Sequence, residues 1–150
     1  MKRLFIASLL AFAPFTWALD QAGSQRLSDL QQRWAQIQYQ TPKDKRADAF
    51  EKLAADASTL VHQHPGSAEP LIWEGIINSS WAGATGGLGA LGKVKAAKAS
   101  LEQAMDEYEK ALLEKLYDSH PSSRQLATRL GTSHTAIAKR LRKYGIPGKH

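Results

Sequence analysis

The segment 119–150 holds the side chains with the clearest capacity for chemistry. It contains seven lysines and arginines and no acidic residue, whereas residues 1–118 contain 13 basic and 14 acidic residues. The net charge of +6 therefore arises in this segment. A basic block of this kind can neutralise phosphates, although a charge run is also the ordinary solvated face of a helix. The elements that position the charges must decide between the two interpretations.

Two short helices joined by a tight turn are predicted within 122–145. Ser122 or Ser123 can accept hydrogen bonds from the free N–H groups that open the first helix. Gly131 can adopt the left-handed conformation that ends it, and Ser133 can cap the second helix. The pattern predicts a helix-turn-helix.

Helical periodicity assigns the faces of these helices. Leu126 and Leu130 form one apolar stripe, and Ile137, Leu141 and Tyr144 form another. The outer face of the second helix is then polar and basic, with Thr135, Lys139, Arg142 and Lys143. A further helix is predicted over 106–117, and three helices can enclose a small core.

The run from Glu109 to Ile146 resembles a known family. Its segments PSSRQLA, RLGTSHTAIA and RLRKYGI are similar to the C-terminal DNA-binding domain of TyrR-type regulators of aromatic amino-acid genes, and more distantly to the Fis family. Such regulators carry a sensing region and an ATPase domain ahead of this tail. Nothing of that size or pattern fits in the residues before it, so effector and ATP binding are not expected here.

The resemblance implies binding of double-stranded DNA, with the helix over 133–144 in the major groove. Its N-terminal residues would approach base edges, its cations would meet phosphates or guanines, and arginines of the preceding helix would hold the flanking backbone. The implied DNA-binding residues are Arg124, Arg129, Ser133, His134, Thr135, Lys139, Arg140, Arg142 and Lys143. One domain covers one half-site, and a homodimer is left open because no dimer contact is evident.

The first eighteen residues have the order of a secretory signal peptide. Two positive charges precede an apolar run from Leu4 to Phe15, and Thr16 and Ala18 are small residues before a cleavage point. The run is short for a membrane span, which needs about 20 residues. A buried N-terminal helix is the alternative.

Between these segments the sequence predicts helices only. Apolar residues recur at helical spacing in four segments, which predicts four helices. They are 24–39, a second that is capped at Thr41 and runs to Val61, 68–81, and 92–104. Trp73, Gly75 and the spacing A-x3-L-x2-A within 97–104 resemble a tetratricopeptide repeat, and the stretch 70–104 is similar to exported bacterial proteins of that type. A protein partner of this domain is left open.

The glycine-rich segment 82–95 matches two phosphate-binding patterns by letter. Gly87, Gly89 and Gly92 fit GxGxxG, and 87–93 fits the start of a P-loop. Both motifs need a preceding strand, and the P-loop needs Ser or Thr where Val94 stands. With no cysteine and no close group of histidines, no cofactor, metal site or enzyme activity is expected.

The sequence therefore predicts an all-α chain with three parts. Residues 1–18 are a signal peptide, 19–104 a tetratricopeptide-like helical domain, and 105–150 a three-helix TyrR/Fis-like DNA-binding domain. The preferred function is sequence-specific DNA binding, and the alternative is an exported protein-binding scaffold that carries the tail as a passenger. The two ends imply different compartments, periplasm and nucleoid, so we interpret the chain as a composite joined near Met105.

Overall fold

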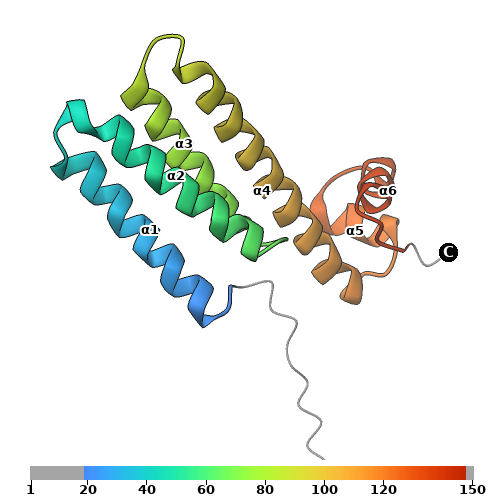
Figure 1. Cartoon of the computed structure of the whole chain (residues 1–150). Helices are drawn as coiled ribbons and strands as arrows, with labels where there is room; N and C mark the ends of the chain where they lie inside the picture. The colour runs from blue at the N-terminus through green and yellow to red at the C-terminus, as the bar shows by residue number, and fades with distance from the viewer. Residues whose placement is uncertain (1–18, 148–150) are drawn as a thin grey trace, which may run out of the picture.

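The computed structural model describes residues 19–147, and within that range every regular element is a helix. The signal peptide expected over 1–18 lies outside the described residues. The helices are α1 (Gln21–Gln40), the 3-10 helix η1 (Lys43–Lys45), α2 (Arg46–Gln63), α3 (Ala68–Thr85), α4 (Ala90–Ser119), α5 (Ser123–Leu130) and α6 (His134–Lys143) (Figure 1). The predicted all-α fold with a C-terminal helix-turn-helix is confirmed. No helix in the described range is long and apolar enough to cross a membrane.

Helices α1 to α4 lie side by side, each running back along its predecessor (Figure 1). The apolar stripes of α1, α2 and α3 meet in one core, which includes Leu27, Leu30, Phe50, Leu53 and Ile77. Helix α4 packs on α3 beside this core. The burial of this apolar surface is the main force that holds the four helices together.

A tryptophan pair links α1 to α3. Trp34 and Trp73 pack edge to face with ring centroids 5.9 Å apart. The indole Nε1 of Trp34 donates a hydrogen bond of 2.8 Å to Ser80 Oγ, so its polar group keeps a partner as the ring is partly buried.

The start of α2 differs from the sequence expectation. Thr41 is the residue that ends α1 and not the cap of the next helix, because η1 comes first. Pro42 has φ −54°, which suits this tight turn. Arg46 Nε donates to the carbonyl of Thr41 at 2.8 Å and ties the turn to α2.

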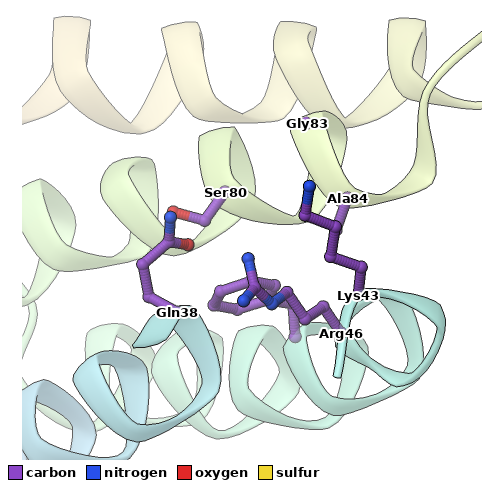
Figure 2. A pocket seen from close by; sticks show the side chains of 7 residues that line it. Gln38, Lys43, Arg46, Ser80, Gly83 and Ala84 are labelled. Carbon is purple, nitrogen blue, oxygen red and sulfur yellow. The ribbon is translucent and has the colours of Figure 1, made fainter. Parts of the chain in front are cut away.

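A hollow of about 460 Å³ opens beside this turn. Figure 2 shows the side chains of Lys43 and Arg46 reaching toward it from one side, with Gln38 and Ser80 across from them. Because it lies against the last turns of α3, it is at the far end of the bundle from α5 and α6 (Figure 1).

Helix α4 is one continuous helix of 30 residues, where the sequence led us to expect separate helices over 92–104 and 106–117. That expectation is wrong because neither proline nor glycine occurs between Lys93 and Ser119, and most residues there favour helix. Ala104 is buried beside α3 and Leu113 is buried in the C-terminal core, so the one helix serves both parts of the chain. Position 105, the expected joint, lies inside it.

The glycine-rich segment turns the chain from α3 into α4. Gly86 and Gly87 have positive φ values of 65° and 55°, which only glycine adopts readily. Further back, Gly75 lets α3 and α4 approach closely, because a Cβ there would lie 2.6 Å from Leu101 Cγ. A helix and not a strand precedes the turn, in agreement with the expectation that it lacks a nucleotide-binding context. The assignment to tetratricopeptide repeats stays a prediction.

Candidate nucleic-acid interface

The end of α4, α5 and α6 enclose a second small core (Figure 1). Leu126 and Ile137 are fully buried at its centre, and Leu113 and Leu141 complete it from both sides. Ile146 also packs into this core. Burial of these few side chains fixes α6 against α4 and α5.

The turn between α5 and α6 has the caps that the sequence predicted. Ser122 Oγ accepts a hydrogen bond of 3.2 Å from Gln125 N, which decides between the two candidate serines. Ser133 Oγ accepts from Ala136 N at 3.2 Å. Gly131 has φ 64° and ψ 35°, and Thr132 N donates back to the carbonyl of Ala127 at 3.0 Å. These contacts set the angle between the two helices.

Two apolar residues differ from their expected places. Leu130 was expected beside Leu126 in the buried stripe, yet it is 38% exposed because α5 ends there and turns away. Ile146 takes part in the core instead, since Gly145 with φ 67° bends the chain back and Ile146 N bonds the carbonyl of Leu141 at 2.9 Å.

Seven of the nine sequence-predicted site residues are exposed and make no ion pair with the described part of the chain. Ser133, His134 and Thr135 lie at the N-terminal end of α6, where the helix dipole is positive. Of the six predicted cations, four have no carboxylate partner among residues 19–147: Arg124, Arg129, Lys139 and Arg142.

The other two cations are held by α4. Arg140 Nε lies 2.9 Å from Glu109 Oε1, and Lys143 Nζ lies 2.6 Å from Asp106 Oδ1. Lys143 was expected on the open outer face of α6, but in the last turn its long side chain reaches back to α4. About half of each side chain is still exposed to solvent.

The acidic residues of α4 that hold α6 in place were not predicted from the sequence. Besides their ion pairs, Glu109 and Asp106 accept from Tyr144: the hydroxyl lies 2.5 Å from Glu109 Oε2 and 3.2 Å from Asp106 Oδ1. Burial and the nearby Glu109 carboxylate raise the pKa of Tyr144. The hydrogen bond from Lys143 lowers the pKa of Asp106. The sequence did contain a signal for this contact: Asp106 and Glu109 are three residues apart and so share one face of their helix, and the last turn of α6 is basic.

We expect acid to weaken this docking. The pKa of Asp106 is lower in the folded chain, so its stabilising effect is complete at neutral pH and is lost as the pH falls through that lowered pKa. Asp106→Asn should therefore show a smaller drop in melting temperature between pH 7 and about pH 3 than the parent chain. Asp118→Asn, a change at an exposed carboxylate of the same helix, should keep the parent's drop. Equal drops in all three proteins, measured by circular dichroism, would contradict this.

Known proteins match this same region. A family model described as a helix-turn-helix domain matches residues 98–147. The protein named HTH-type transcriptional regulatory protein TyrR is 49% identical over 55 residues in Enterobacter agglomerans, which is 37% of this chain and 11% of that relative. The protein of the same name in Haemophilus influenzae is 49% identical over 47 residues, or 31% of this chain and 15% of the relative.

A third relative of that name, from Citrobacter braakii, is 51% identical over 47 residues, which is 31% of this chain and 9% of the relative. The chain thus spans only about a tenth of the length of the curated relatives it matches first. No solved structure matches the chain. The matched region holds most of α4, the caps at Ser122 and Ser133, the turn at Gly131 and the exposed basic α6. Residues 98–147 are a helix-turn-helix DNA-binding domain of the TyrR type.

Proposed function

We propose that the chain binds duplex DNA in a sequence-specific way by laying α6 in the major groove. The observation that supports this best is the exposed N-terminal end of α6, flanked by four cations that no described carboxylate neutralises. A helix of ten residues is about 15 Å long and fits a major groove about 12 Å wide.

The side chains divide into two roles. In this proposal Ser133, His134 and Thr135 reach base edges, where short polar groups can discriminate between bases. Lys139 and Arg142 of α6, with Arg124 and Arg129 of α5, are placed to contact phosphates on either side of the groove. The first group gives sequence preference, and the second gives salt-dependent affinity.

Arg140 and Lys143 contribute less to DNA affinity in this proposal. Each cation is already paired with a carboxylate, so a phosphate has to compete with Glu109 or Asp106 for it. Their main role is to hold α6 at its angle to α4. This assignment separates them from Lys139 and Arg142, although all four lie on the same helix.

Titration of labelled duplex DNA tests the proposal. We expect binding that weakens steeply between about 50 and 200 mM salt, because released counterions drive it. Lys139→Ala should weaken binding and reduce the slope of log K against log salt by about 1, the value for one lost phosphate contact. Lys143→Ala should change the slope less. Lys95→Ala is the matched control and should leave binding unchanged, because Lys95 is exposed near the start of α4, at the end of this helix away from α5 and α6.

Selection of bound sequences from a random duplex pool tests the specificity. The parent chain should enrich a defined half-site, and Thr135→Ala should relax it by on the order of 1 kcal/mol at one base position. A folded chain without DNA affinity at 50 mM salt contradicts the proposal, and so does equal enrichment of all sequences.

The sequence of residues 1–18 favours a second function, that of an exported helical scaffold. Its positive start, apolar run and small residues have the order of a signal peptide. In that case the chain made in bacteria should lose these residues and accumulate outside the cytoplasm. Mass spectrometry of the purified N-terminus decides this, since an intact Met1 in a cytoplasmic protein excludes it.

A further inference from the structure

An apolar stripe on α4 is left without a partner. Leu91, Val94, Leu101, Met105, Tyr108 and Leu112 follow one another at spacings of three and four, and Lys98 fills the one remaining position. Each of the six apolar side chains is between 38% and 72% exposed. This spacing is the heptad pattern of a helix that packs along a second helix.

The chain's own helices pack on either side of the stripe and leave most of it open, although Leu101 lies at its edge close to Gly75 of α3. Helix α3 packs against the face of α4 that carries the buried Ala97 and Ala104. Helix α6 lies on another face, where it contacts Asp106 and Glu109. An exposed apolar band of this length, interrupted only by Lys98, indicates an interaction surface.

We propose that a second copy of this chain covers the stripe, with the two α4 helices antiparallel. The stripe is symmetric to within one residue about its middle, next to Leu101, which suits a two-fold axis there. In that register Leu91 faces Leu112 of the other copy, Val94 faces Tyr108, Lys98 faces Met105, and Leu101 faces itself. Every apolar member then meets an apolar member or the aliphatic stem of Lys98.

The charges of α4 favour this orientation. Residues 90–99 include three lysines, Lys93, Lys95 and Lys98, and no acid. Residues 100–114 include five acids and one lysine, and although Asp106 and Glu109 are paired with cations of α6, the acids that remain still outnumber the lysine. Antiparallel packing brings each basic half beside an acidic half, whereas parallel packing would put like charges together.

The ion pair near the centre of the stripe, Lys98 with Glu102, is also compatible with a two-fold axis there. Lys98 Nζ lies 3.6 Å from Glu102 Oε1 of its own helix. Two such pairs would meet near the two-fold axis, each one neutral within its own chain. No unpaired charge is therefore buried by the contact.

The same register spaces the two DNA-binding units. Leu113, on the part of α4 that packs against α6, lies about 12 residues from the axis, which is about 18 Å at 1.5 Å per residue. The two units are then about 36 Å apart along the paired helices. This is close to one turn of B-DNA, the usual spacing of half-sites for dimeric helix-turn-helix proteins. Only this spacing rests on the proposed DNA binding; the dimer itself does not.

Sedimentation of the full chain without DNA tests the contact. We expect a reversible monomer–dimer equilibrium at micromolar concentration. Met105→Lys should raise the dissociation constant at least ten-fold, because the added lysine would face Lys98 of the other copy. Met105 is 72% exposed, so the change should leave the fold intact by circular dichroism. Adding Lys98→Glu to that variant should restore the dimer, because the new glutamate at position 98 would face the new lysine at position 105 of the other copy. In a parallel pair each position faces itself, so the second change would not restore the dimer.

Leu130→Asp is the matched control for Leu112→Asp. Both leucines are 38% exposed, but Leu130 lies on α5, away from the stripe. Leu112→Asp should give a monomer, and Leu130→Asp should dimerise like the parent. A parent chain that is monomeric at about 100 μM overturns the inference, and so does a dimer that both Met105→Lys and Leu112→Asp leave unchanged.

Disulfide trapping tests the orientation directly, because the chain has no cysteine of its own. A mixture of Leu91→Cys and Leu112→Cys chains should give a crosslinked heterodimer, and neither variant alone should crosslink. Crosslinking within each single variant would instead show a parallel pair and overturn the inference. A dimer that fails to bind DNA refutes the proposed function only, and a monomer that binds DNA refutes the dimer only.

Discussion

Replacing Ile137 with alanine is expected to destabilise the helix-turn-helix by about 2–5 kcal/mol. Ile137 is fully buried where α6 meets α4 and α5, so the smaller side chain leaves a cavity among Leu113, Leu126 and Leu141. The core of this unit is small, and one such loss is a large share of its stability. DNA binding should fail in parallel, since the exposed end of α6 is placed only while this core is intact.

Denaturant unfolding followed by circular dichroism measures this effect. Lys139→Ala is the control, because it lies two residues further along α6 and is exposed, so its stability should stay within about 0.5 kcal/mol of the parent. The two variants should both weaken DNA binding, but only Ile137→Ala should unfold earlier. An Ile137→Ala chain as stable as the parent would contradict the described core.

The second large effect is expected from Glu107→Pro. In a continuous α4, proline at 107 removes the hydrogen bond to the carbonyl of residue 103 and its ring clashes with that carbonyl, which destabilises by about 3 kcal/mol or more. If instead a helix began near 106, proline in its first turn would be tolerated. The variant thus distinguishes one helix from two.

Glu107→Ala is the matched control, since it removes the same carboxylate and keeps a residue that favours helix. We expect it to unfold close to the parent in a urea titration, well after the proline variant. Equal midpoints for the two variants would show that α4 is interrupted near Met105. The proline variant should also uncouple the helical bundle from the helix-turn-helix core, because α4 packs on α3 at one end and supplies Leu113 to that core at the other.

Much of the local structure was predictable because its causes lie within a few residues. Ser122 and Ser133 cap α5 and α6 through N–H groups three residues ahead, and Gly131 ends α5 through its own backbone freedom. The buried pair Leu126 and Ile137 followed from helical spacing alone. The same reasoning failed at Met105. The sequence resembles one family before this position and another after it, and we took that change for a helix boundary, although no residue there ends a helix.

The DNA-binding residues were predictable only as a set. Their positions on α5 and α6 followed from the resemblance and the periodicity, and the structure places seven of them in the open. The pairing of Arg140 with Glu109 and of Lys143 with Asp106 joins residues 31 and 37 positions apart. No local pattern specifies such a contact, because it depends on the angle at which α6 crosses α4.

By itself, the sequence determined the helices, their caps, the basic end of the chain and the family of that end, since each depends on neighbouring residues or on direct similarity. Only the tertiary structure decided which charges of α6 are free, that Ile146 and not Leu130 enters the core, and that six apolar residues of α4 stay uncovered. Periodicity marks an apolar face but does not say what packs on it. The packing of α3 on one face of α4 and α6 on another leaves the stripe between them exposed.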